Sequence, residues 1–256
     1  MTGAVFSYDA IAEVYATDMG QSMPFDDVGW YRALCQAHPG RALELGCGTG
    51  RILLELLASG VDICGVDRSL PMLRRLCRDA AARGLDPNVA QMDLRDLALT
   101  ERFRVILAPY SLITYVIDPA SANTLLQTLR GMLAEDGLIV LDVFVPQPLT
   151  SFADYRLDYR RPHGSGTLER HKRIHGNADG TNRIERRYRI YASNGDLTEE
   201  FFTQETIRPY SPKALAALAD SAGLHIDAWT YDYATRPTAD GARFATVVLS
   251  DRSAGC

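Results

Sequence analysis

Short apolar runs alternate with stretches of helical periodicity between about residues 40 and 145. The apolar runs are bounded by Gly, Asp, Asn or Pro, which favours buried strands. Five strands are predicted: Ala42–Leu45, Asp62–Val66, Asn88–Met92, Arg104–Ala108 and Leu138–Val143. Three helices are predicted between them: Gly50–Ser59, Ser69–Arg83 with Ser69 as its N-cap, and Ala120–Leu133 closed by Asp136-Gly137. This alternation is typical of βαβ units and a parallel sheet.

The pattern changes on both sides of this region. Before it, Ser7–Thr17 places apolar residues at helical spacing, which predicts an amphipathic helix that covers the carboxyl edge of the sheet or simply packs on it. After Pro146 and Pro148, four strands separated by Gly- and Asn-rich turns predict an antiparallel insert: Arg156–Tyr159, Leu168–Ile174, Arg183–Tyr191 and Leu197–Arg208. A helix capped by Ser211 and two strands follow: Ser211–Ala222, His225–Tyr233 and Phe244–Leu249. We therefore expect three segments, residues 1–148, 149–210 and 211–256.

Composition and charge exclude several classes of protein. The chain has 256 residues, of which 46% are apolar, and its 27 basic and 32 acidic residues give a net charge of −5, so no overall basic field attracts nucleic acid. No apolar run is long enough to span a membrane and the start of the chain does not resemble a signal peptide, so we expect a cytoplasmic protein. Five cysteines without CxxC spacing predict reduced thiols rather than disulfides or a zinc site: Cys35, Cys47, Cys64, Cys77 and Cys256.

A glycine-rich turn, Leu43-Glu44-Leu45-Gly46-Cys47-Gly48-Thr49-Gly50, follows the first predicted strand. Glycines at 46 and 48 let a ligand approach the main chain, and the start of the next helix offers free N–H groups to an anion. A nicotinamide fingerprint needs a third glycine where Arg51 stands, and no Gly-Lys pair completes a Walker A loop. The turn therefore predicts a ligand site of another kind.

Acidic residues end the next two strands. Asp67, about 20 residues past the glycine turn, is placed to accept hydrogen bonds from two ribose hydroxyls. Asp93, which stands between the apolar Met92 and Leu94, is placed to accept a hydrogen bond from an exocyclic amine. Because the carboxyl ends of parallel strands open on one crevice, we expect Gly46–Gly48, Asp67 and Asp93 to converge there.

These residues resemble the class I S-adenosylmethionine (SAM) dependent methyltransferases. The turn from Glu44 to Gly50 matches the family's E/D-x-G-x-G-x-G loop, Asp67 its ribose-binding acid, and Met92-Asp93 its adenine-contacting pair. The resemblance implies an α/β fold with a Rossmann-like seven-stranded sheet in the order 3-2-1-4-5-7-6, its last strand antiparallel, an antiparallel insert that caps the active site, and SAM as cofactor. The residues expected to bind SAM are Tyr15, Glu44, Gly46, Cys47, Gly48, Asp67, Arg68, Met72, Met92, Asp93, Leu94 and Ala108.

Two further segments narrow the resemblance. Together with the insert, they are similar to bacterial natural-product methyltransferases, especially the amino-sugar N-methyltransferases. The two segments are Tyr8-Asp9-x-Ile11-Ala12-x-x-Tyr15 and Pro109-Tyr110-Ser111-Leu112-Ile113-Thr114-Tyr115. This chain has Tyr110 and Thr114-Tyr115 where that family commonly has Phe and Gly-Tyr. The resemblance implies antibiotic biosynthesis and a small-molecule acceptor, with no membrane or nucleic-acid partner, and it leaves homo-oligomer formation open.

Methyl transfer needs an aligned acceptor and a site without water rather than a metal. An amine acceptor needs little help from a base, whereas a hydroxyl needs a carboxylate or histidine within hydrogen-bonding reach. No histidine stands near residues 109–115, so we favour N-methylation over O-methylation. Tyr15, Tyr110 and Tyr115 are the candidates for positioning the methyl group and the acceptor, although buried tyrosines equally often only fill a core.

Two histidines and a basic cluster lie in the insert. His171 and His175 stand four residues apart in a predicted strand, which separates them by about 13 Å, so they cannot share a metal ion. We expect both histidines to be solvated residues at the edge of the insert. They would line the acceptor pocket only if the insert caps the sheet. The basic cluster predicts a charged outer face or, alternatively, a site for an anionic acceptor; its members are Arg170, Lys172, Arg173, Arg183, Arg186, Arg187 and Arg189.

Three other functions stay open. An RNA or DNA base methyltransferase usually has Asn/Asp-Pro-Pro-aromatic after the fourth strand, where this chain reads Ala108-Pro109-Tyr110-Ser111. A protein that binds SAM without transferring its methyl group has no sequence feature against it. A nicotinamide oxidoreductase is disfavoured by Arg51.

Overall fold

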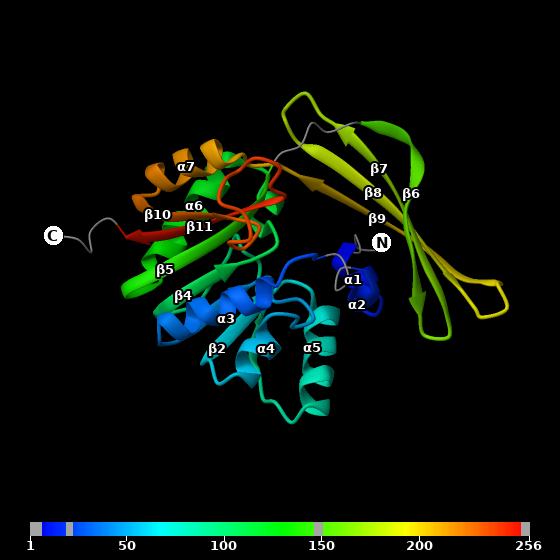
Figure 1. The fold of residues 1–256 in the computed structure, drawn as a ribbon, viewed down its shortest axis with the longest axis horizontal. Coiled ribbons are helices and arrows are strands. Elements are labelled where there is room, and N and C mark those ends of the chain that lie inside the picture. The colour runs from blue at the N-terminus through cyan, green and yellow to red at the C-terminus, as the bar shows by residue number, and fades with distance from the viewer. Residues whose placement is uncertain (1–6, 19–22, 146–150, 252–256) are drawn as a thin grey trace.

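The computed structural model describes residues 7–18, 23–145 and 151–251, and its centre is a seven-stranded sheet (Figure 1). In spatial order the strands are β3 (Asn88–Gln91), β2 (Ile63–Asp67), β1 (Ala42–Leu45), β4 (Phe103–Ala108), β5 (Leu133–Phe144), β11 (Phe244–Asp251) and β10 (Leu224–Tyr231). Strands β1 to β5 are parallel, and β11 runs antiparallel to both β5 and β10. The predicted order 3-2-1-4-5-7-6 is confirmed.

Helices cover both faces of this sheet, which is why its central strands are mainly apolar and buried. One apolar cluster joins the sheet to α6 (Pro119–Gly131) and α7 (Pro212–Ser221). The other joins it to α3 (Asp27–Ala37), α4 (Leu53–Ala58) and α5 (Leu70–Ala82). Capping by Ser69 is confirmed, because its Oγ accepts a hydrogen bond from the backbone N–H of Met72 at 3.3 Å.

The structure corrects several predicted boundaries. Asp136-Gly137 does not close α6, because that helix ends at Gly131 and β5 runs through the pair, with Asp136 in a left-handed conformation (φ 51°). The predicted helix Ser7–Thr17 is two short helices, α1 (Ser7–Ile11) and α2 (Tyr15–Asp18). Helix α3 and the 3₁₀ helix η1 (Leu112–Tyr115) were not predicted.

The predicted antiparallel insert is a separate four-stranded sheet in the order β6 (Phe152–His163), β7 (Gly166–Gly176), β8 (Asn182–Tyr191) and β9 (Leu197–Ile207). It follows β5 in the chain, and the chain returns to the seven-stranded sheet through α7. In Figure 1 this second sheet extends away from the first, with α1 and α2 beside it. The described residues do not include the predicted segment boundary at 148–149.

The expectation that His171 and His175 are solvated edge residues is wrong. Both lie on β7, which is paired on one side with β6 and on the other with β8. The Nδ1 atom of His171 and the Nε2 atom of His175 are buried and have no hydrogen-bonding partner in the described part of the chain. The pKa of His171 is lowered by burial and by the neighbouring Arg187.

Cysteines and helices give two further findings about the described residues. Cys35, Cys47 and Cys64 are buried free thiols and Cys77 is an exposed one, as predicted, whereas Cys256 lies outside the described residues. None of the described helices has the length and apolar character needed to cross a membrane.

Candidate active site

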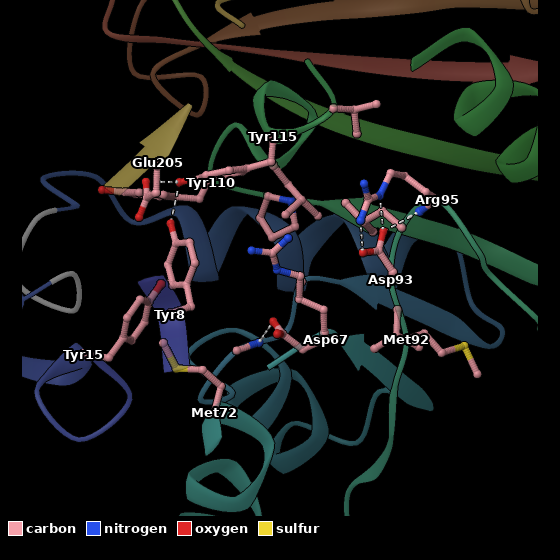
Figure 2. Close-up of a pocket in the computed structure, with 18 of the residues that line it drawn as sticks. Tyr8, Tyr15, Asp67, Met72, Met92, Asp93, Arg95, Tyr110, Tyr115 and Glu205 are labelled. Atoms are coloured by element: carbon pink, nitrogen blue, oxygen red, sulfur yellow. Dashed lines mark hydrogen bonds and ion pairs between the residues drawn. The ribbon is translucent and has the colours of Figure 1, made fainter. Parts of the chain in front are cut away.

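A cavity of about 380 Å³ opens at the carboxyl ends of the parallel strands (Figure 2). Its floor comes from the turns after β1, β2, β3 and β4, and Tyr8 of α1, Tyr15 of α2 and the end of β9 complete its wall. The residues that line it are Tyr8, Tyr15, Gly46, Gly48, Val66, Asp67, Arg68, Met72, Met92, Asp93, Leu94, Arg95, Pro109, Tyr110, Leu112, Tyr115, Val116, Gln204, Glu205 and Thr206. The three strand ends singled out in the sequence therefore meet at one cavity.

Gly46 and Gly48 form the part of the wall that only backbone can make. Both have positive φ, 65° and 54°, a conformation that favours glycine. A Cβ atom at position 46 would lie 2.8 Å from Cδ1 of Leu112 and would intrude on the cavity wall. The missing side chains leave a cradle in which a ligand can contact the main chain.

Asp67 is fixed by the same turn. Its Oδ2 accepts a hydrogen bond from the N–H of Gly48 at 2.9 Å, and its Oδ1 accepts one from the N–H of Ser69 at 2.7 Å. Burial raises the pKa of Asp67, and these two N–H groups oppose that shift. Because each carboxylate oxygen has two lone pairs, both can still accept a hydrogen bond from a ligand hydroxyl.

Asp93 lies at the rim of the cavity and is paired with Arg95, a lining residue that the sequence analysis missed. Its carboxylate accepts hydrogen bonds from Nε of Arg95 at 2.8 Å and Nη2 at 2.6 Å. Hydrogen bonds from Arg95 lower the pKa of Asp93 to about 2, so the group is ionised at neutral pH. Met92 and Leu94 give this ionised acceptor apolar neighbours.

Tyrosine hydroxyls gather on the opposite side of the cavity. The hydroxyl oxygens of Tyr8 and Tyr115 are 2.5 Å apart, and the Tyr115 hydroxyl donates to Oε2 of Glu205 at 3.3 Å. Tyr15 packs against Tyr8 with ring centroids 6.3 Å apart. Burial raises the pKa of all three tyrosines, so they stay neutral hydrogen-bonding groups at physiological pH. Tyr8 was part of the motif read from the sequence but was not predicted as a site residue.

The turn after β4 carries Tyr110 and is held from behind by Asp142 of β5. Tyr110 and Ser111 both have left-handed backbone conformations, with φ 56° and 57°. The N–H of Tyr110 donates to Oδ2 of Asp142 at 3.0 Å, and this fully buried carboxylate also accepts hydrogen bonds from the hydroxyls of Tyr31 and Tyr233. No local pattern could reveal these contacts, because the partners lie far apart in the chain.

Three predicted cofactor-binding residues do not line the cavity. Side chains alternate between the faces of a strand, so Glu44 points away from Leu43 and Leu45 into the interior, where burial raises its pKa to about 8 and its Oε2 has no described hydrogen-bonding partner. The sulfur of Cys47 packs against Gly65, and Ala108 belongs to the apolar cluster beside α6.

The basic cluster of the insert is largely neutralised by acids. All of its members except Arg187 form an ion pair with a described acidic residue. Arg173 and Arg183 share Glu185, for example, and Arg189 pairs with Glu200. The structure therefore favours paired charges over a site for an anionic acceptor, but Arg170 and Arg186 do not lie on the predicted outer face, because only 11% and 16% of their side chains are exposed.

The comparisons with known proteins agree on the fold and on the class of domain. Residues 42–137 match the family model described as a methyltransferase domain. A Geobacillus protein named as a methyltransferase is 27% identical over 103 residues, 40% of this chain. The glycine/sarcosine N-methyltransferase of Aphanothece halophytica is 25% identical over 104 residues, again 40% of this chain. The matched segment spans 42% and 39% of the length of these two relatives.

Solved structures match over nearly the whole chain. A SAM-dependent methyltransferase from Clostridium acetobutylicum has a TM-score of 0.80 at 16% identity, with coverage of 95% of this chain and 98% of that one. The CcbJ methyltransferase of Streptomyces caelestis has a TM-score of 0.79 at 23% identity, covering 96% and 98%. SAM-bound CalS10, an amino pentose methyltransferase from Micromonospora echinaspora, has a TM-score of 0.71 at 19% identity, covering 93% and 96%. Residues 42–137 thus match a methyltransferase domain, and the chain has the fold that these solved methyltransferases share.

Proposed function

We propose that the protein transfers a methyl group from SAM to the amine of a small, sugar-like acceptor. The observation that carries the proposal is one cavity with two differently built sides. Backbone and strand-end acids form the side expected to hold the adenosyl group, and neutral tyrosine hydroxyls and Glu205 form the other.

The lining residues fit SAM. The Gly46–Gly48 turn leaves main chain open to a ligand, Asp67 has lone pairs for two ribose hydroxyls, and Asp93 is an ionised acceptor for an exocyclic amine beside Met92. A cavity of about 380 Å³ lies within the range usual for small-molecule sites. When bound, SAM supplies an electrophilic methyl group on a positively charged sulfur.

The residues on the acceptor side position a nucleophile and exclude water. Tyr8, Tyr15 and Tyr115 are half-buried in the cavity wall and present hydroxyl groups that orient a polar acceptor. No described histidine lines the cavity, and the carboxylate of Glu205 on this side can pair with a positively charged amine. The similarity to the glycine/sarcosine N-methyltransferase of Aphanothece and to CalS10, an amino pentose methyltransferase, supports an amine acceptor. A role of the protein in antibiotic biosynthesis is part of this proposal.

The cofactor half of the proposal is tested by calorimetric titration of SAM into the wild type and Asp67→Ala. Loss of the ribose contacts should weaken binding by about 10- to 100-fold, since a hydrogen bond to a charged group contributes about 1.5–3 kcal/mol. Asp62→Ala is the matched control, because Asp62 immediately precedes the same strand at its opposite end. Unchanged affinity in Asp67→Ala, or thermal stabilisation by NAD instead of SAM, contradicts the proposed cofactor site.

The acceptor half is tested with pairs of small sugars that differ only in an amino or a hydroxyl group. Mass spectrometry should detect a methyl group on the amino member of a pair and none on the hydroxyl member. Methylation of the hydroxyl members alone would replace N-methylation with O-methylation. Binding of SAM without any transfer would instead favour the non-catalytic function left open by the sequence.

A further inference from the structure

Glu205 is the only carboxylate on the acceptor side of the cavity among the described lining residues. The other two lining acids are Asp67, the last residue of β2, which is held by backbone N–H groups, and Asp93, which follows β3 and is held by Arg95. Glu205 comes from β9, and only about 8% of its side chain is exposed. A carboxylate buried to this extent is costly unless it has partners, so its contacts show what role it can take.

Both contacts that hold Glu205 end on the same oxygen. Nη1 of Arg186, on the adjacent strand β8, lies 2.9 Å from Oε2, and the hydroxyl of Tyr115 donates to Oε2 at 3.3 Å. Figure 2 shows the Glu205 carboxylate beside the Tyr115 and Tyr8 hydroxyls at the cavity. No described residue forms a hydrogen bond with Oε1. One oxygen is therefore anchored and the other is available to a ligand.

The titratable groups that face Glu205 cannot take its place as a proton acceptor. They are Tyr8 from α1, Tyr115 from η1 and Arg186 from β8. Burial raises the pKa of both tyrosines, so their hydroxyls donate hydrogen bonds and keep their protons. The Arg186 guanidinium stays charged at any physiological pH. Among the described lining residues, Glu205 thus supplies the one carboxylate on this side of the cavity.

We propose that Glu205 binds the acceptor as an ammonium ion and removes the proton that blocks its nitrogen lone pair. This inference rests on the proposed N-methyl transfer and names a base for it. A proton passes from the ammonium nitrogen to Oε1 of Glu205 and leaves a neutral amine. The nitrogen lone pair then forms the new bond to the methyl carbon, and the electron pair of the broken carbon–sulfur bond stays on sulfur. The product is a methylated ammonium ion, and the Glu205 proton returns to solvent.

The test is the pH dependence of kcat/KM in the wild type and Glu205→Gln, with small amino sugars as probes. The wild type uses the abundant ammonium form, so its kcat/KM should be flat below the acceptor's own pKa. The variant must wait for the rare neutral amine, so its kcat/KM should rise about tenfold per pH unit up to that pKa. The deficit of the variant, about 100-fold two units below the acceptor's pKa, should therefore shrink as pH rises. A purely structural role would give a deficit that does not change with pH.

Two further variants separate the role of Glu205 from other effects of its replacement. Because Glu205→Gln leaves Arg186 without its ion-pair partner, the profile is also measured in the double variant Arg186→Gln/Glu205→Gln, which has no unpaired cation. Glu200→Gln is the control, since Glu200 lies on β9 but pairs with Arg189 and does not line the cavity. Its profile should match the wild type.

The outcomes separate the inference from the proposed function. Amine methylation with parallel pH profiles in the wild type and both Glu205 variants overturns the role of Glu205 and leaves N-methyl transfer in place. SAM binding without transfer to any amine overturns N-methyl transfer, and the role of Glu205 falls with it. The inference is supported if all variants bind SAM with equal affinity and if kcat/KM rises steeply with pH only in the variants that lack Glu205.

Discussion

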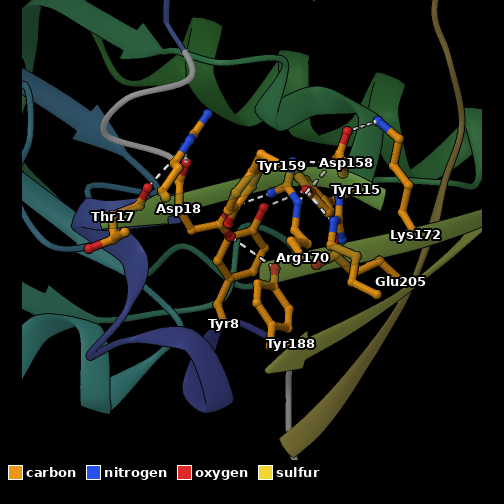
Figure 3. Close-up of polar contacts among 12 residues, drawn as sticks. Tyr8, Thr17, Asp18, Tyr115, Asp158, Tyr159, Arg170, Lys172, Tyr188 and Glu205 are labelled. Atoms are coloured by element: carbon orange, nitrogen blue, oxygen red, sulfur yellow. Dashed lines mark hydrogen bonds and ion pairs between the residues drawn. The ribbon is translucent and has the colours of Figure 1, made fainter. Parts of the chain in front are cut away.

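Two fully buried aspartates show how differently the two sheets are held in place. Asp142 of β5 accepts hydrogen bonds from Tyr31, Tyr233 and Thr246, which lie on elements that already pack together through apolar side chains. Asp18 of α2 accepts hydrogen bonds from the side chains of Tyr159, Arg170 and Tyr188, and all three of these residues belong to the four-stranded sheet (Figure 3). The first aspartate lies inside one packed body, whereas the second joins two.

The apolar contacts around each aspartate explain the difference. The seven-stranded sheet lies between two large clusters of buried residues, so its position does not depend on any single polar contact. The apolar cluster shared by the N-terminal helices and the four-stranded sheet is much smaller: its buried members are Ile11, Ala12, Val14, Met72, Leu168 and Tyr188. Polar contacts at Asp18 therefore do more of the positioning on the acceptor side. Tyr8 and Tyr15, which line the cavity, lie in these same helices.

The largest loss of global stability is expected for Asp142→Ala. The substitution leaves the hydroxyls of Tyr31 and Tyr233 and the N–H of Tyr110 as buried donors without an acceptor. We expect a loss of about 3–5 kcal/mol in the free energy of unfolding, measured by urea denaturation. Thr246→Val removes one donor only and should cost about 1 kcal/mol. Equal losses in the two variants would show that Asp142 is not the centre of this network.

A smaller global loss, with a larger functional one, is expected for Asp18→Ala. Arg170 keeps Asp158 as a partner, so the cost in unfolding free energy should be about 2 kcal/mol. Hydrogen exchange should rise in α1, α2 and the facing strands but not in β1 to β5. Misplacement of Tyr8 and Tyr15 should lower methyl transfer by up to about 100-fold.

Glu13→Ala is the matched control for Asp18→Ala. Glu13 lies between the same two helices, but its ion pairs with Arg75 and Arg78 of α5 are exposed to solvent. Exposed ion pairs contribute little, so exchange and transfer should stay near the wild type. If Asp18→Ala raised exchange throughout the seven-stranded sheet as well, the two regions would form one cooperative unit and the contrast between them would be lost.

The same contrast explains what could be predicted from the sequence. The central parallel strands are largely buried, and β1, β2 and β3 end at or just before Gly46, Asp67 and Asp93, so runs such as Ala42–Leu45 and these two acids could be placed from local pattern. The acceptor side depends on contacts such as that of Tyr115 with Glu205, 90 residues away in the chain. Local periodicity carries no information on such a contact, so Glu205 was not identified as a site residue and Arg186 was placed only in the basic cluster of the insert.

The last effect, at Glu44, is on stability alone and depends on pH. Burial raises the pKa of Glu44 from 4.5 to about 8 in the folded protein. Below pH 4.5 both the folded and the unfolded chains are protonated there, so burial carries no ionisation penalty. Between pH 4.5 and 8 the unfolded chain loses this proton while the folded one retains it, so the stability of the wild type falls over this window. Glu44→Gln carries no titrating group at this position and should lack that loss.

The stability difference between the wild type and Glu44→Gln isolates this residue, because every other titrating group is common to both proteins. Relative to the wild type, the variant should gain about 3 kcal/mol from pH 5 to pH 8, because one pKa unit corresponds to about 1.4 kcal/mol, and for a chain of this length each kcal/mol raises Tm by about 2–4 °C. Glu55→Gln, at an exposed acid on α4, is the control and should show no such trend. A wild-type Tm that stays parallel to that of Glu44→Gln across the window would mean that Glu44 is ionised in the folded protein. The interior beside the glycine turn would then hold a charge next to Arg51, and the cavity would be more negative than its lining residues indicate.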